Sequence, residues 1–220
     1  MWCFSRSPLT IAIDLVAVVS DASYHSLVER IPGGGVTPEQ AQAADDRQSK
    51  IGVVQLVLFG ATAIVFILWF SRAYRNLGRL GIYGLRWSER WAVGAWFVPL
   101  LNFVRPKSIA NDIWRGSDPG LAAHAPLPPG GDLGRVPWYH TAWWALFIVS
   151  GLFERFANQH FLNADTASSL SSATAELLVS DSLDIVAAAL AIAIVYQTVK
   201  RQRLRARVLA DHAAQSGDRT

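Results

Sequence analysis

The sequence predicts an all-α fold, a polytopic helical bundle in a membrane with four spans and a broken helical segment on the cytoplasmic side. Three observations support this prediction. Residues 51–70 contain no charged side chain, and at about 1.5 Å per helical residue they cover roughly 30 Å, the hydrocarbon thickness of a bilayer. Hydrophobic residues make up 51% of the chain and charged residues only 17%. Arginines cluster directly after the apolar run, as they do at the cytoplasmic end of a span.

Four segments are predicted to cross the membrane within a single membrane domain over residues 1–210. The second segment has the clearest apolar signal, and the fourth is rich in alanine and isoleucine. The third contains several tryptophans and is close to the minimum length of a span. The first is interrupted by Asp14, and a cleaved secretory signal peptide remains the alternative reading of it. The predicted spans are residues 8–28, 51–71, 137–154 and 177–199.

The distribution of basic residues predicts the orientation in the cytoplasmic membrane. With both termini in the cytoplasm, sixteen of the 20 Lys and Arg residues lie on the cytoplasmic side, which is the positive-inside pattern. An even number of spans is required by this orientation. Residues 31–50 and 163–175 are then flexible outer loops, while residues 116–136 and 211–220 are predicted to be disordered in the cytoplasm.

Residues 88–117 are predicted to form the broken segment, which either dips into the inner leaflet or lies on it. Its apolar run, Trp91–Val104, has about 14 residues and is too short for an ordinary span. Pro99 and Pro106 interrupt the run, and proline disfavours helix at the residue before it. Asn102 lies between the prolines and has the amide groups to satisfy backbone freed by the break.

The same part of the chain carries a pattern that resembles a known family. An apolar span ends in Trp-x-x-Arg-x-x-Arg-Asn, Trp-x-x-Gly-x-Trp-Phe-x-Pro-x-x-Asn-x-x-x-Pro follows, and Ile-Trp-Arg closes the pattern. It is similar to the bacterial membrane family called domain of unknown function 4328. The resemblance covers residues 51–207 and implies a multi-span domain of a bacterial membrane without an assigned activity. The matching positions are Trp69, Arg72, Arg75, Asn76, Trp91, Gly94, Trp96, Phe97, Pro99, Asn102, Pro106, Ile113, Trp114 and Arg115.

Candidate contact residues lie in the arginine cluster and in the broken segment. A basic side chain near an anionic membrane surface contributes about 1 kcal/mol, and tryptophan anchors proteins at the interface. The alternative is that the arginines only set the topology and that the broken segment is only an anchor. The candidate contacts to anionic lipids of the inner leaflet or to a partner are Arg72, Arg75, Asn76, Trp91, Trp96, Pro99, Asn102, Pro106 and Trp114.

Ionisable residues inside the predicted spans are further candidates, because such groups need partners in a membrane. Asp14 and His140 are predicted at similar depth and form the candidate intramembrane pair, while Arg155 and Asp184 form a second pair near the outer face. The alternative is that these side chains reach water at the interface. The basic stretch at residues 200–207 is predicted to continue the last helix and to lie on the inner membrane surface.

No residue pattern points to catalysis, a metal or a cofactor. Cys3 is the only cysteine, the histidines lack metal-ligand spacing, and the basic residues do not form a nucleic-acid-binding face. We therefore expect a non-catalytic scaffold or regulatory module that binds lipids and a protein partner or a second copy. The alternative is a small oligomeric transporter or channel, lined by the broken segment and packed through small residues between Ala187 and Ala193. A lipid-modifying enzyme using His140 with Asp14 is a third possibility.

Overall fold

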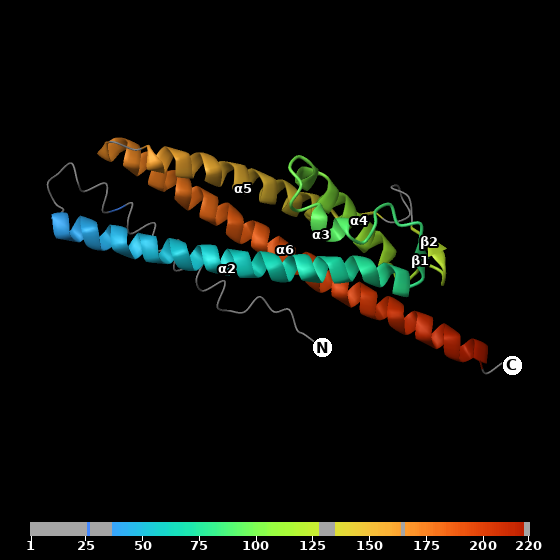
Figure 1. Ribbon diagram of the computed structural model, residues 1–220. Coiled ribbons are helices and arrows are strands. Elements are labelled where there is room, and N and C mark those ends of the chain that lie inside the picture. Colours follow the sequence, from blue (N-terminus) through green and yellow to red (C-terminus); the bar gives the residue numbers. More distant parts are fainter. Residues whose placement is uncertain (1–25, 27–36, 128–134, 164–165, 218–220) are drawn as a thin grey trace. The chain divides into compact units, whose positions relative to one another are not determined.

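The structure, a computed structural model, describes residues 26, 37–127, 135–163 and 166–217, and these residues are mostly helical (Figure 1). This agrees with the predicted all-α class. The chain divides into two compact units, residues 1–62 with 143–189 and residues 63–142 with 190–220. The elements are α2 (Pro38–Arg79), β1 (Ile82–Tyr83), α3 (Trp91–Gly94), the 3-10 helix η2 (Leu101–Phe103), α4 (Arg105–Gly116), β2 (Ala125–Pro126), α5 (Trp138–Leu162) and α6 (Ala167–Gly217).

Two of the long helices begin earlier in the sequence than predicted, because each starts with a reciprocal cap. Before α2, the Gln40 N–H donates to Thr37 Oγ1 at 3.3 Å and the Thr37 N–H donates to Gln40 Oε1 at 3.1 Å. Before α6, the Thr166 and Ser169 N–H groups each donate to the other's hydroxyl oxygen at 3.1 Å. Such caps satisfy N–H groups that lack partners at a helix start. Residues 38–50 and 167–175, predicted as flexible loops, are therefore helical.

In the first unit, small side chains are buried on both α5 and α6. Ser150 and Ala157 are buried on α5, and Ala173, Ser180 and Ala187 are buried on α6. Each series has a seven-residue spacing, which places its members on one helix face. Small residues of this kind let helix backbones approach closely and are typical of membrane helices. Ala187, predicted to pack against a second copy, is thus buried within the chain.

Polar and apolar contacts accompany these small residues in the same unit. His160 Nδ1 lies 3.0 Å from Glu176 Oε2, which joins α5 to α6. Ala44 of α2 is buried against Phe161 and Leu170. In its described residues, the unit therefore contains segments of α2, α5 and α6 joined by these contacts.

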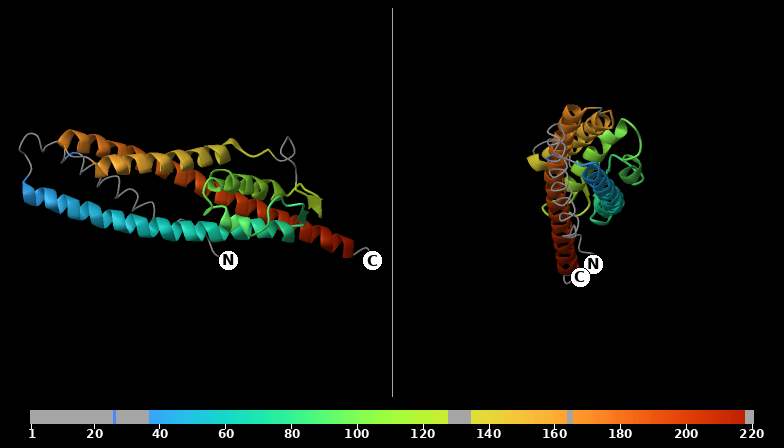
Figure 2. Two further views of the ribbon diagram at one scale, coloured as in Figure 1. Left: turned by 45° about the horizontal axis from the view of Figure 1, so that its top comes forward. Right: turned by 90° about the vertical axis from the view of Figure 1, so that its left-hand side faces the viewer.

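In the second unit, β1 and β2 form a two-stranded parallel sheet (Figures 1 and 2). Ile82 lies opposite Ala125. Gly81 has φ +76°, and a Cβ there would lie 3.0 Å from the backbone nitrogen of His124, so only glycine fits. Residues 117–127 belong to the stretch 116–136 that was predicted to be disordered, and the pairing shows that this prediction is wrong for them. Residues 128–134 lie outside the described residues.

Two helices, α2 and α6, are long and apolar enough to cross a membrane. None of the most apolar window of α2 is buried, and only 18% of that of α6 is, whereas the central helix of a soluble protein is mostly buried. Val53, Leu56 and Phe59 of α2 are all exposed. This exposure suits helices that lie in lipid.

The predicted arrangement of four spans is not confirmed, because only two such helices are found among the described residues. The helix α5 covers the third predicted span and has 25 residues, but Glu154 and Arg155 interrupt its apolar sequence. The first predicted span, residues 8–28, lies outside the described residues except for Ser26. The helix α6 continues to Gly217, so residues 211–217 are helical and not disordered as predicted.

We expect Ala173→Leu to lower the free energy of unfolding by about 1–3 kcal/mol, because Ala173 is fully buried and a larger side chain overfills its site. Thermal unfolding of the purified protein in detergent, followed by circular dichroism, measures this change. Ala189→Leu is the matched control, since Ala189 is exposed on the same helix. Equal unfolding temperatures for the two variants would contradict the packing described here.

Candidate functional site

The broken segment of the second unit turns sharply at Pro99–Leu101. The Leu101 N–H donates to the Pro99 carbonyl oxygen at 2.8 Å, and Leu100 between them has φ 65° and ψ −40°. This geometry approaches the classic γ-turn, which is rare and strained for a residue with a Cβ. Pro106 lies in the first turn of α4, where a missing N–H group costs no hydrogen bond. The two prolines therefore delimit the break.

Residues 97–104, which we call the apolar loop, expose large hydrophobic side chains around this turn. Phe97 is 71% exposed, Leu100 is 79% exposed and Val104 is 66% exposed. Contiguous exposed apolar side chains of this kind mark contacts with membranes or with other proteins. Asn102 has a buried Oδ1 with no hydrogen-bond partner among the described residues.

Aromatic contacts hold the ends of the apolar loop in place. The ring of Trp96 meets Phe66 and Phe70 of α2 edge-on, with centroids 5.6 Å apart in both pairs. The Arg105 guanidinium lies 3.8 Å from the ring centroid of Trp91 and 4.5 Å from that of Trp87. Such cation–π contacts contribute about 0.5–2 kcal/mol each. Two of the candidate tryptophans are thus engaged in internal packing.

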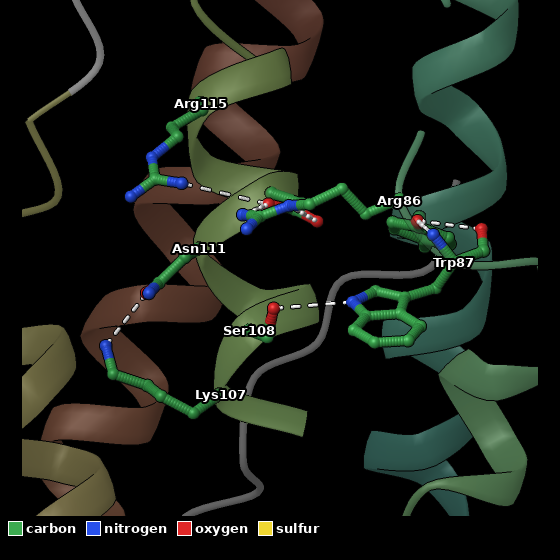
Figure 3. Close-up of polar contacts among 8 residues, drawn as sticks. Arg86, Trp87, Lys107, Ser108, Asn111 and Arg115 are labelled. Carbon is green, nitrogen blue, oxygen red and sulfur yellow. Dashed lines mark hydrogen bonds and ion pairs between the residues drawn. The ribbon is translucent and has the colours of Figure 1, made fainter. Parts of the chain in front are cut away.

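An ion pair joins α4 to the segment that follows β1. Arg86 donates through Nε to Asp112 Oδ2 at 3.3 Å and through Nη2 to Asp112 Oδ1 (Figure 3). The Asp112 side chain is fully buried and that of Arg86 is 50% exposed. Burial raises the pKa of Asp112, and the hydrogen bonds from Arg86 and the nearby charge of Arg115 oppose this rise. The same hydrogen bonds raise the pKa of Arg86.

Trp87 links three elements of the second unit beside this pair. The Tyr74 hydroxyl of α2 donates to the Trp87 carbonyl oxygen at 2.9 Å. The Trp87 indole Nε1 donates to Ser108 Oγ of α4 at 3.3 Å (Figure 3). The segment between β1 and α3 is therefore fixed to both α2 and α4.

Arg205 of α6 is completely buried and binds only carbonyl groups. Its Nε donates to the Leu80 oxygen at 3.0 Å, at the end of α2. Its Nη1 donates to the oxygens of Asp118 at 2.7 Å and Leu121 at 3.0 Å, and its Nη2 donates to that of Ala122 at 3.1 Å. Four of the five guanidinium N–H groups are thus used. This contact orders the loop after α4.

Two neighbours of Arg205 add to the contact between α6 and the rest of the unit. Arg201 Nη2 donates to Asp118 Oδ2 at 3.0 Å, and its guanidinium lies 4.3 Å from the ring centroid of Trp114. Gln202 Nε2 donates to the Ala73 carbonyl oxygen at 2.9 Å and Gln202 Oε1 accepts from Asn76 Nδ2 at 3.2 Å. Asn76, a candidate contact residue, is therefore a structural link.

The prediction that residues 200–207 lie on the membrane surface is wrong for Arg201 and Arg205, whose side chains bind within the second unit. Arg203 and Arg207, on the other side of the helix, are exposed. The spacing of the residues carries a signal for the burial of Arg205. Arg205 follows Ile194 by eleven residues, about three helical turns, so the two side chains lie on the same face of α6, and Ile194 is buried.

His140 of α5 is 1% exposed and lies against two aromatic rings. Its ring centroid is 4.8 Å from that of Trp114 and 5.3 Å from that of Tyr139. Neither ring nitrogen has a hydrogen-bond partner within the described part of the chain. Asp14 lies outside the described residues, so its pairing with His140 stays a prediction.

The second predicted pair, Arg155 with Asp184, is not among the ion pairs of the described residues, and both side chains are exposed. The charge of Asp184 acts instead on another side chain of α5, that of Glu154.

All nine candidate contact residues belong to the second unit. Pro106 and Trp114 are buried there. Arg72, Arg75 and Pro99 are exposed. The sequence did not predict the buried charges, above all those of Asp112 and Arg205, because a single charged residue on an apolar helix face does not reveal its partner.

The described residues thus define a helical protein in which α2 and α6 are apolar and of membrane-spanning length, and in which a proline-broken segment is fixed by buried charges. The chain belongs to the family described as domain of unknown function (DUF4328), which matches residues 33–200 and confirms the resemblance found in the sequence. No curated protein and no solved structure matches the chain.

We expect Arg205→Met to lower the free energy of unfolding by about 3–5 kcal/mol, because it leaves four carbonyl groups without their buried charged donor. Chemical denaturation of the purified protein followed by near-ultraviolet circular dichroism measures the loss. Arg203→Met, which removes an exposed charge from the same helix, should change the value by less than about 0.5 kcal/mol. Similar values for both variants would show that the Arg205 contacts are unimportant.

Removal of either partner of the Arg86–Asp112 pair should have unequal effects. Arg86→Met strands a fully buried carboxylate and should cost about 3–5 kcal/mol, whereas Asp112→Asn leaves a half-exposed guanidinium that water can solvate and should cost about 1–2 kcal/mol. Unfolding in denaturant gives both numbers. The reverse order would contradict this account of the pair.

The loss in Arg86→Met should also depend on pH. Without Arg86, burial holds the pKa of Asp112 further above its unfolded value, so the folded state binds more protons and becomes relatively more stable as the pH falls. Unfolding of Arg86→Met and wild type between about pH 8 and pH 5 should therefore converge towards low pH. Arg90→Met, at an exposed position, provides the control and should show a constant difference.

Proposed function

We propose that the protein is a non-catalytic scaffold or regulatory module of the bacterial cytoplasmic membrane. In this proposal the apolar loop is embedded in the inner leaflet, both termini are cytoplasmic, and the surrounding residues contact lipids and a protein partner or a second copy. The observation that carries the proposal is the exposure of Phe97, Leu100 and Val104 on a strained turn. Membrane-spanning length and composition in α2 and α6 support it.

The energetics favour insertion of the apolar loop. Removal of one large apolar side chain from water contributes about 1.5–3 kcal/mol, while an unusual backbone conformation such as that of Leu100 costs about 1–3 kcal/mol. Three exposed side chains together outweigh this strain. The contacts of Trp96 and Arg105 hold the loop before it meets lipid, so insertion requires little further ordering.

Charge supports the orientation. Arg72 and Arg75 are exposed on the part of α2 that belongs to the same unit as the apolar loop. Each basic side chain near an anionic leaflet adds about 1 kcal/mol. The candidate lipid contacts are therefore these two arginines together with the loop.

The use of charged groups in the second unit supports a structural role. Asp112 is bound by Arg86, Asp118 by Arg201, and Arg205 by backbone carbonyls. Each of these groups connects one segment to another. A unit fixed in this way suits the presentation of a surface to a partner.

We expect a polarity-sensitive fluorophore at Leu100→Cys, in a Cys3→Ser background, to report an apolar environment in lipid nanodiscs. Its emission should shift to the blue and be quenched by lipids brominated in their acyl chains, because the side chain enters the hydrocarbon. Tyr83→Cys, an exposed position on β1 in the same unit, is the control and should stay accessible to an aqueous quencher. Aqueous quenching at position 100 equal to that at position 83 would refute insertion.

A small oligomeric transporter or channel is the second candidate, and the buried, unpartnered Oδ1 of Asn102 favours it. In that case the broken segment would line the path. Solute flux into proteoliposomes that is lost in Asn102→Ala would decide for this alternative and against a scaffold.

A further inference from the structure

Three helices of the second unit bring positively charged and polar side chains to one side of α4. Lys107 and Trp114 are seven residues apart on α4 and share a face with Asn111. His140 of α5 and Arg201 of α6 both contact Trp114, at 4.8 Å between ring centroids and 4.3 Å from guanidinium to ring. Figure 3 shows Lys107 and Asn111 on the side of α4 that faces away from Arg86 and Trp87.

Lys107 has no carboxylate partner among the described residues. Its Nζ donates to the amide oxygen Asn111 Oδ1 at 2.8 Å. Burial and the positive charge of Arg115 lower the pKa of Lys107 to about 8. Nearby carboxylates are already bound, Asp112 by Arg86 and Asp118 by Arg201. Among the described residues, the Lys107 ammonium is therefore not balanced by a carboxylate.

His140 provides a second and independent sign of a binding site. The side chain is 99% buried, yet neither Nδ1 nor Nε2 has a hydrogen-bond partner within the described ranges. Buried polar atoms without partners are uncommon, and each one calls for an explanation such as a missing ligand. The His140 ring and the Arg201 guanidinium both lie against the Trp114 ring, and Lys107 lies two helical turns before Trp114 on the same face of α4. Arg201 Nε is likewise buried without a partner among the described residues.

We propose that Lys107, His140 and Arg201 form a binding site for a phosphate group, supplied by a lipid headgroup of the inner leaflet or by free phosphate. The ammonium of Lys107, one imidazole N–H of His140 and the Nε–H of Arg201 supply donors to its oxygens, and Trp114 supplies an apolar wall. A tetrahedral anion with several acceptor oxygens suits donors that come from different helices. This inference goes beyond the scaffold proposal and stands independently of the apolar loop.

The test measures phosphate-dependent stabilisation of the full-length protein in phospholipid-free detergent. Inorganic phosphate should raise the midpoint of thermal unfolding of the wild type above that in chloride at equal ionic strength, because a ligand of the folded state stabilises it. Lys107→Gln keeps a donor for Asn111 and should weaken the apparent affinity about tenfold. Lys107→Arg should restore most of the affinity. Lys200→Gln, which removes an exposed charge, should change it less than about twofold.

A second arm identifies the source of the phosphate group. Native mass spectrometry compares retention of phosphatidylglycerol with that of a phosphate-free diacylglycerol glycolipid. Retention of phosphatidylglycerol that depends on Lys107 supports the site and assigns it to a lipid headgroup, and stabilisation by inorganic phosphate alone supports the site and assigns it to the free anion. Absence of both effects in the wild type, or equal effects of Lys107→Gln and Lys200→Gln, overturns the inference.

The outcome is separable from that of the proposed function. If the labelled apolar loop enters lipid but the protein does not respond to phosphate or phosphatidylglycerol, only the proposed phosphate site is ruled out. A phosphate response that depends on Lys107, in a protein whose apolar loop stays in water, supports the phosphate site and rules out the proposed insertion of the loop.

Discussion

The buried guanidinium of Arg205 is the interaction on which the arrangement of the second unit depends. It binds the carbonyl of Leu80 at the end of α2 and three carbonyls of the loop after α4. A helix end and a glycine- and proline-rich loop both carry backbone oxygens that need donors when buried. One side chain from a distant part of the chain donates to four of these oxygens. The unit is therefore closed by hydrogen bonds and not by apolar packing alone.

The shape of the broken segment depends on these hydrogen bonds of Arg205. With the loop after α4 held to α6, α4 presents Asp112 to Arg86 on one side and Trp114 to Arg201 on another. Arg105, at the start of α4, fixes the preceding residues by its stacking on two tryptophans. Arginine is suited to this repeated use, because its planar, weakly hydrated cation both donates hydrogen bonds and stacks on rings.

The sequence was sufficient for features that depend on local pattern. The apolar run at residues 51–70, the break at two prolines and the family resemblance all follow from neighbouring residues. Contacts between distant residues were not predictable, since nothing near Arg205 reveals that loop carbonyls will surround it. The helix starts at Pro38 and Ala167 were readable in principle from the caps that precede them, but apolarity was given more weight than capping.

The leucine at position 100 has a consequence for the engineering of this fold. Its φ of 65° suits glycine, so substitution with glycine should relieve strain and make the isolated protein more stable. The same change removes the most exposed apolar side chain of the loop. Under the proposed insertion of the apolar loop, selection for thermostability alone would favour a variant that folds better and binds the bilayer less well, a trade-off between stability and membrane binding at one residue.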